Sequence, residues 1–385
     1  MGRRLLVVGL AVALALYPVS AAAHALLLFA DPVPDAILQR PPAAITLTFT
    51  EPVTPAGNGI KVFSPSGRQV ATPARAAGRT LTAATTSGES GTYIVIWQVF
   101  AADTHPSRGA FRFSVGSPTP NPYSPLLSGG EIGTATPLGF VLQALARWMH
   151  FFGVALTFGV IIYERMTRRE RRLRRAVLGG LLLLVAAEPV ALVAQLASLS
   201  FDGATAIAVM ASDFGRLLGL RLAVAVLLWA VLALDVFWPV LGLGIVMALI
   251  DGATAHALPG LGGAGLLLNA IHVAAMALWV GALAGMVYTS SVSSPARGGG
   301  QGGGHVRYPL YAFGVSVVSG LLLAFAHVGF PPGLTTGYGW ALAIKVGVVG
   351  IAIVTALLGR RRAELGVVAL ILAAAAVLVS LPPPR

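Results

Sequence analysis

Hydrophobic and polar residues alternate in short runs through the first third of the chain. Residues 45–50, 60–63 and 110–115 place apolar side chains at every second position, residues 93–97 are apolar throughout, and Pro and Gly lie between the runs. This period is typical of half-buried β-strands, and no helical period accompanies it. The pattern predicts an all-β sandwich of the immunoglobulin-like Greek-key type over residues 24–117.

From Leu138 onward the pattern changes to long apolar segments. Each segment is close to the roughly 20 residues that a helix needs to cross a bilayer. The expected spans are 138–164, 177–200, 215–236, 238–257, 264–290, 308–330, 338–359 and 364–382. Residues 138–385 are therefore predicted to form an all-α membrane domain of eight transmembrane helices. A segment rich in Pro, Ser and Gly, residues 118–137, reads as the linker between the two domains.

The first 23 residues have the pattern of a secretory signal peptide. Arg3 and Arg4 precede an apolar run over residues 5–17, and three alanines lie just before His24. Cleavage after these alanines would make His24 the first residue of the mature protein. An uncleaved signal anchor is the alternative.

Composition agrees with a membrane protein, because 56% of the residues are hydrophobic and only 10% are charged, against about one quarter charged in soluble domains. The absence of cysteine excludes disulfides and thiolate metal sites. The net charge of +12 comes from arginines beside the apolar segments. The positive charge therefore reflects the orientation of the helices in the membrane. The expected partner is the lipid bilayer, and no binding to nucleic acid is expected.

The arginines also predict the orientation in the membrane. The outer loops 201–214, 258–263 and 331–337 contain no Lys or Arg, whereas the inner loops contain Arg165, Arg168, Arg169, Arg171, Arg172, Arg174, Arg175, Arg297, Arg307 and Arg360 to Arg362. Positive charge marks the cytoplasmic side. We expect a multi-pass protein of the bacterial cytoplasmic membrane with its N-terminal domain outside. The cluster over residues 165–175 could alternatively bind a regulator or an acidic lipid.

Three residues suggest a metal site on the β domain. Asp103 and His105 are two apart after an apolar strand, so both side chains can face one ion. A mature N-terminal His24 would add its amine and its imidazole. This set of nitrogen and oxygen ligands suits Cu(II). The alternative is that Asp103 starts a turn and His105 is an ordinary surface residue.

The first third of the chain resembles the CopC family of periplasmic copper proteins. The resemblance rests on His24-Ala25, on residues 45–53 (ITLTFTEPV), on Gly91-Thr92-Tyr93 and on Asp103-Thr104-His105-Pro106. It implies a β-sandwich that binds Cu(II) through His24, Asp103 and His105. Some members also have a methionine-rich Cu(I) site, but this chain has no methionine between residues 24 and 137. That second site is therefore expected to be missing.

Polar side chains within the apolar segments suggest a path for copper. The candidates are His and Met residues expected in the outer half of the membrane: Met149, His150, His256, His272, Met276 and His327. Met276 lies one helical turn beyond His272 on the same face. Thioether and imidazole together suit Cu(I). The alternative is that the methionines pack and the histidines bond other helices or water.

Three charged residues lie deeper in the expected helices, namely Glu188, Asp251 and Lys345. Charge in the membrane costs a few kcal/mol per group, so a partner is expected for each. Glu188 or Asp251 could neutralise Lys345. The set is interpreted either as an ion pair that locks helices together or as a proton or ion relay.

The second part resembles the CopD membrane proteins associated with copper uptake and resistance. The resemblance rests on His272 with Met276, on residues 278–283 (LWVGAL), on Tyr338-Gly339 followed by Lys345, and on Arg360-Arg361-Arg362. It implies copper transport toward the cytoplasm. A CopC-like domain on the same chain would supply the copper.

The combined hypothesis is copper binding outside the membrane and copper import across it, without enzymatic activity. No phosphate-binding loop and no Ser/His/Asp spacing is present, which argues against an ATP-driven pump. Two alternatives stay open. One is a membrane copper reductase with b-type haem between His150 and His272. The other is a copper buffer that the helices only tether.

Overall fold

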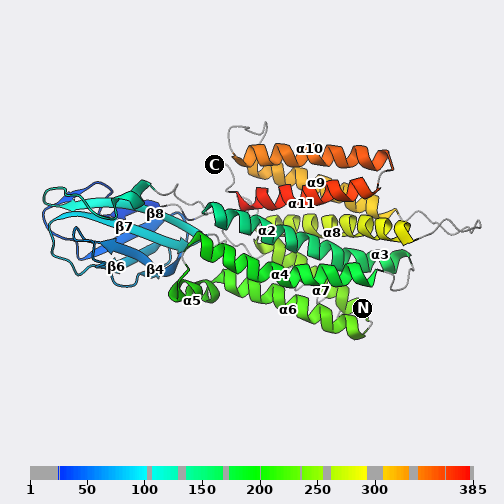
Figure 1. The fold of residues 1–385 in the computed structure, drawn as a ribbon, viewed down its shortest axis with the longest axis horizontal. Helices are drawn as coiled ribbons and strands as arrows, with labels where there is room; N and C mark the ends of the chain where they lie inside the picture. The colour runs from blue at the N-terminus through cyan, green and yellow to red at the C-terminus, as the bar shows by residue number, and fades with distance from the viewer. Residues whose placement is uncertain are drawn as a thin grey trace, which may run out of the picture. The chain divides into compact units, whose positions relative to one another are not determined.

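The computed structural model in Figure 1 describes residues 25, 27–101, 106–128, 136–167, 173–199, 201–234, 236–254, 262–292, 307–328, 337–359 and 361–381. The chain forms two compact units. The helical unit consists of Leu142–Ala191 and Leu218–Arg385, and the β unit consists of Ala21–Val141 together with Leu192–Leu217.

The described part of the β unit contains eight strands in two four-stranded sheets. One sheet has the order β1 (Leu27–Asp31), β3 (Ala44–Phe49), β6 (Thr80–Ala84) and β5 (Arg75–Ala77). The other has the order β2 (Ile37–Leu38), β8 (Pro106–Val115), β7 (Gly91–Phe100) and β4 (Thr54–Phe63). All pairs are antiparallel except β2 with β8. The two-sheet all-β domain confirms the fold predicted for this part.

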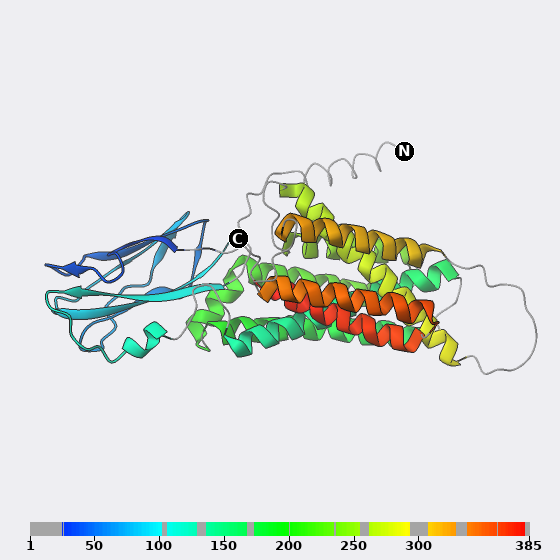
Figure 2. The ribbon, with the colours of Figure 1, turned by 90° about the horizontal axis from the view of Figure 1, so that it is seen from above.

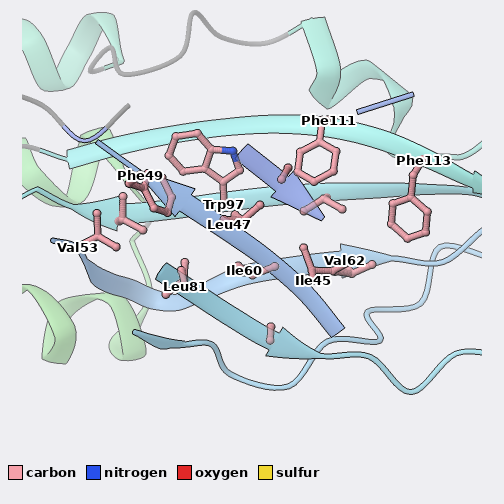
Figure 3. Packing of buried hydrophobic residues seen from close by; sticks show 14 of the residues in the cluster. Ile45, Leu47, Phe49, Val53, Ile60, Val62, Leu81, Trp97, Phe111 and Phe113 are labelled. Atoms are coloured by element: carbon pink, nitrogen blue, oxygen red, sulfur yellow. The ribbon is translucent and has the colours of Figure 1, made fainter. Parts of the chain in front are cut away.

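The core between the sheets follows from the alternating sequence. In β3, Ile45, Leu47 and Phe49 are fully buried while the threonines between them are only partly covered. Figure 3 shows these side chains meeting Ile60, Leu81 and Trp97 from other strands. The Trp97 ring meets the Phe49 ring edge-on with centroids 5.2 Å apart. Apolar burial of this kind is the main stabilising contribution to such a domain.

The sequence pattern located β3, β4, β7 and β8 but missed the other four strands. β2 and β5 have two and three residues, too few to establish a period. In β1 the exposed Leu28 and Phe29 interrupt the expected alternation. In β6 the buried residues are Leu81 and Ala83, and Leu81 is the only large apolar side chain among threonines and alanines, so the apolar signal of this strand is weak.

The first residues of the predicted linker 118–137 pack on the sandwich. The Nδ2 of buried Asn121 donates to the carbonyl oxygens of Ser64 at 2.9 Å and Thr92 at 2.8 Å. The Tyr123 ring stacks on Phe63 with centroids 4.0 Å apart. A short 3-10 helix, η1 (Ser124–Ser128), follows. These contacts fix the chain after β8 at the end of β4 and the start of β7.

A hydrogen-bonded carboxylate joins two loops of the β unit. Glu89 Oε1 accepts from Arg68 Nη2 at 2.5 Å, and both of its oxygens accept from Ser66 at 3.1 Å. The hydrogen bond from Arg68 lowers the pKa of Glu89 to about 2. The Tyr93 hydroxyl donates to the Glu89 carbonyl oxygen at 2.6 Å, and burial raises the pKa of Tyr93.

The helical part contains eight helices long and apolar enough to cross a membrane among the described residues. The first consists of α2 (Pro137–Val154), the π-helical turn η2 (Ala155–Gly159) and α3 (Val160–Thr167). The others are α4 (Arg174–Ser198), α6 (Asp213–Leu234), α7 (Phe237–Thr254), α8 (Gly262–Val292), α9 (Tyr308–Val328), α10 (Gly337–Leu357) and α11 (Arg361–Ser380). They run alongside one another in Figure 1 and Figure 2. All eight predicted spans are confirmed as helices.

One helix was not predicted. α5 (Gly203–Ala211) lies in the segment expected to be an outer loop. Asp202 caps it, because its Oδ1 accepts from the backbone N of Thr205 at 2.8 Å. Val209 is fully buried with Ala56 and Phe100 of the sandwich. Nine residues are too few to span a bilayer, so the sequence signal did not distinguish this helix from a loop.

Glycines allow close packing inside the helical unit. A Cβ at Gly159 would lie only 3.0 Å from the Gly281 Cα, and a Cβ at Gly281 would meet the backbone of Gly159 at 2.4 Å. Small residues at such contacts let membrane helices approach and gain dispersion energy. The contact brings η2 against α8.

Candidate functional site

The metal ligands predicted for the β unit, His24, Asp103 and His105, lie outside the described residues. The flanking strands are well defined. Phe100 at the end of β7 pairs with Pro106 at the start of β8, so residues 101–105 connect two neighbouring antiparallel strands. β1 begins three residues after His24.

The structure places His150 at the centre of a buried polar cluster in the helical unit. Its Nε2 lies 2.9 Å from both carboxylate oxygens of Asp251 in α7. Its Nδ1 lies 3.4 Å from Oε1 of Glu188 in α4. The side chains of His150, Glu188 and Asp251 are 5%, 4% and 2% exposed. Residues from three helices, far apart in sequence, thus meet around one imidazole.

Arg221 of α6 completes this cluster and is not among the residues predicted from the sequence. Its Nη2 donates to Asp251 Oδ1 at 2.9 Å and to Thr254 Oγ1 at 2.8 Å, and its Nε donates to the same Asp251 oxygen at 3.1 Å. An arginine inside an apolar helix requires an acidic partner. That rule would have marked Arg221 as a site residue. The set His150, Glu188, Arg221 and Asp251 is called the His150 cluster below.

The expected pairing of Lys345 with Glu188 or Asp251 does not occur among the described residues. Asp251 is bonded to His150 and Arg221. Lys345 lies on α10, which packs chiefly along α11, whereas the two carboxylates lie on α4 and α7. Lys345 therefore belongs to a different region of the helical unit from the two acids.

His272 of α8 is oriented by α9. Its Nδ1 lies 3.0 Å from Ser319 Oγ. The Ser319 hydroxyl donates its own proton to the Val315 carbonyl at 2.6 Å. His272 Nδ1 must therefore carry a proton and donate it, which leaves a lone pair on Nε2. Gly320 gives the ring its space, since a Cβ there would lie 2.9 Å from His272 Cε1.

The other residues of the predicted copper path are only partly visible. Met276 is buried in the helix core at 8% exposure, and Met149 is half-buried next to His150. His256 and the side chain of His327 lie outside the described residues. Within the part of the chain that is described, no group of three or more His, Asp and Glu side chains is arranged to hold a metal ion.

The surroundings of His150 do not fit haem ligation. Both of its ring nitrogens face carboxylates, at 2.9 Å and 3.4 Å. An axial haem ligand needs one nitrogen directed at iron. The contacts likewise leave neither nitrogen open to a copper ion.

Fold and site together define a class: a polytopic helical membrane protein that carries an N-terminal β-sandwich. Residues 27–116 match the family model described as "CopC domain". The chain is 34% identical over 98 residues to Protein YobA of Escherichia coli strain K12, covering 24% of this chain and 79% of that protein. The same values hold for Protein YobA of Shigella flexneri. The chain belongs to the CopC family through its β domain.

Two crystal structures also align with this part of the chain. CopC from Methylosinus trichosporium OB3b is 28% identical, with a TM-score of 0.23, and the alignment covers 26% of this chain and 100% of that one. PcoC from Escherichia coli, described as a methionine-rich copper resistance protein, is 27% identical, with a TM-score of 0.22 and coverage of 24% and 99%. The family match ends at residue 116, before the first membrane-length helix begins.

Proposed function

We propose that the protein binds copper with its CopC domain and carries copper across the cytoplasmic membrane, without an enzymatic step. The observation that carries the proposal is the occurrence of a CopC domain at residues 27–116 and eight membrane-length helices in one chain. A binding domain fused to a polytopic domain supplies cargo to that domain at a high effective concentration. Transport is the activity that uses this arrangement most directly.

The proposed Cu(II) ligands are the amine and imidazole of a mature N-terminal His24, together with Asp103 and His105. Nitrogen and oxygen ligands of this kind suit the tetragonal geometry of Cu(II). The connection between β7 and β8 would present Asp103 and His105, because Phe100 and Pro106 close that pair of strands.

The proposed orientation places the β domain outside the cytoplasmic membrane and moves copper inward. Arginines at the ends of the described helices support it: Arg165, Arg174, Arg175, Arg307 and Arg362 all belong to the inner side in this topology. The proposed membrane path uses Nε2 of His272 and the sulfur of Met276, with His256 and His327 as further candidates. Cu(I) is the form that these ligands suit.

The first experiment tests binding in the full-length protein. One serine inserted between Ala23 and His24 would displace the N-terminal amine from the imidazole by one residue. We expect Cu(II) affinity to fall at least tenfold, with N-terminal sequencing used to establish processing of both proteins. The same serine inserted between Gly129 and Gly130 is the control and should leave affinity unchanged. Equal affinity in all three proteins would reject the N-terminal ligand.

The second experiment tests transport. Cells that express the protein should accumulate more cytoplasmic copper than cells that express a variant with His272→Ala and Met276→Leu. Binding at the β domain should be the same in both. If accumulation is also the same, His272 and Met276 are not part of the copper path. If neither protein raises accumulation above that of cells that lack it, the helices only tether a copper buffer and the transport proposal fails.

A further inference from the structure

The His150 cluster contains a contact that ordinary hydrogen bonding leaves incomplete. Four helices contribute one ionisable side chain each: His150 from α2, Glu188 from α4, Arg221 from α6 and Asp251 from α7. His150 lies directly against Glu188 and Asp251, and Arg221 is bonded to the same Asp251. The balance of protons and charges in this cluster can therefore be followed atom by atom.

The half of the cluster around Asp251 is complete. Arg221 donates twice to Asp251 Oδ1, at 2.9 Å and 3.1 Å, which keeps that carboxylate ionised. His150 Nε2 lies 2.9 Å from both Asp251 oxygens and must donate to them, because an ionised carboxylate only accepts. Nε2 therefore keeps its proton. The charges of Asp251 and Arg221 cancel.

The half around Glu188 is not complete. His150 Nδ1 is buried and has no hydrogen-bond partner, although Glu188 Oε1 lies 3.4 Å away. Without a proton between them, the lone pair of Nδ1 would face an ionised carboxylate in a nearly dry site. One proton, on either atom, makes the contact attractive and the cluster neutral. Release of that proton leaves one uncompensated negative charge among apolar helices.

Both helices that hold this proton are locally irregular. Glu188 is followed by Pro189 inside α4, and proline removes a backbone hydrogen bond and loosens a helix at that turn. The π-helical turn η2 begins five residues after His150 in the same membrane span, and such turns are frequent at functional sites. The contact can therefore open by a small change in either helix.

We propose that His150 Nδ1 and Glu188 Oε1 hold a single exchangeable proton inside the membrane. When the proton leaves, it goes to bulk water and the net charge of the cluster falls by one. Its use as the coupling ion for copper movement rests on the proposed transport function. Proton binding itself does not, and it can be measured without copper.

The test uses the copper-free, full-length protein in lipid nanodiscs, with its histidines labelled with ¹⁵N. The His150 signal is assigned by its loss in His150→Gln. We expect one step with pH at a single midpoint, seen in the protonation of His150 Nδ1, in the infrared carbonyl band of protonated Glu188, or in both signals if the two atoms share the proton. In Glu188→Gln the amide neither releases a proton nor carries a negative charge that would favour a protonated Nδ1, so the step should disappear.

Glu164→Gln is the matched control. This carboxylate also lies in the first membrane span, but it accepts from the Leu173 backbone N at 2.8 Å and lies outside the His150 cluster. The His150 step should persist in this variant. A step that is unchanged in Glu188→Gln, or absent from the wild-type protein, would overturn the proposal. If Glu188→Gln does not fold, His150→Gln decides by infrared alone, since the Glu188 band should then lose its titration at that midpoint.

A separate measurement addresses the coupling. Copper accumulation in cells should depend on the proton gradient in the wild-type protein and lose that dependence in Glu188→Gln. Accumulation that ignores the gradient in both proteins would refute coupling while leaving copper transport intact. If no protein raises copper accumulation, copper transport is refuted. The proton site is then still decided by the NMR and infrared titrations.

Discussion

Arg221 of α6 and Asp251 of α7 form an ion pair with an Nη2–Oδ1 distance of 2.9 Å, in which the Asp251 side chain is only 2% exposed. The pair joins two apolar helices through charges that neither helix could bury alone. It also fixes the carboxylate that orients His150. Stability and the proposed proton site therefore depend on the same contact.

Replacing Asp251 with Asn should destabilise the helical unit by about 3 kcal/mol, because Arg221 would keep a charge without an ionised partner. The measurement is the unfolding free energy in detergent micelles. Asp213→Asn is the control. It removes the exposed pair with Arg216, whose side chains are 62% and 71% exposed, and such pairs contribute at most about 1 kcal/mol. Equal losses in the two variants would contradict the structure.

The packing of η2 on α8 predicts that Gly281→Ala destabilises the protein by about 2 kcal/mol, since overpacking forces backbone shifts. The added Cβ would lie 2.4 Å from the Gly159 backbone, which has no flexible end to move aside. Gly314→Ala, in α9, is the control because nothing lies within 4 Å of its Cβ position. That change should be neutral or slightly stabilising, as alanine favours helix. Thermal unfolding of both variants provides the comparison.

Glu89 predicts an acid-sensitive step in the β unit. Its pKa falls from an ordinary value of 4.5 to about 2, so the carboxylate stabilises the fold above pH 4.5 and loses that contribution as the pH falls toward 2. Glu89→Gln should flatten the stability curve in this window. Arg68→Gln should flatten it as well, because the arginine is the main cause of the shift. An unchanged acid slope in both variants would show that the contact is absent in solution.

Gly320 offers a test of His272 that leaves His272 in place. Gly320→Ala would put a methyl group 2.9 Å from the Cε1 atom of the ring and turn Nε2 away from its present direction. If His272 is part of the copper path, copper accumulation should fall several-fold while protein abundance stays constant. Gly314→Ala in the same helix should accumulate copper like the wild type. A normal level in Gly320→Ala would remove His272 from the path.

The strands and spans that the sequence identified were those with a strong local period. β3 alternates Ile, Leu and Phe with Thr, and each membrane helix is a continuous apolar run, so their elements follow from neighbouring residues alone. The short strands β2 and β5 and the helix α5 gave no such signal. They exist because the rest of the unit packs around them.

The sequence by itself determined the class of protein, because the cost of exposing apolar side chains to water decides which segments form strands and which enter the membrane. It also marked His150, Glu188 and Asp251 as unusual, since each is polar in an apolar segment. Only the tertiary structure decided their partners. The packing of helices α2, α4, α6 and α7 places Arg221 beside Asp251, whereas Lys345 lies elsewhere. His150 and Asp251 are 101 positions apart in the sequence, yet their side chains lie 2.9 Å apart. Such contacts follow from the packing of helices, which no local sequence pattern encodes.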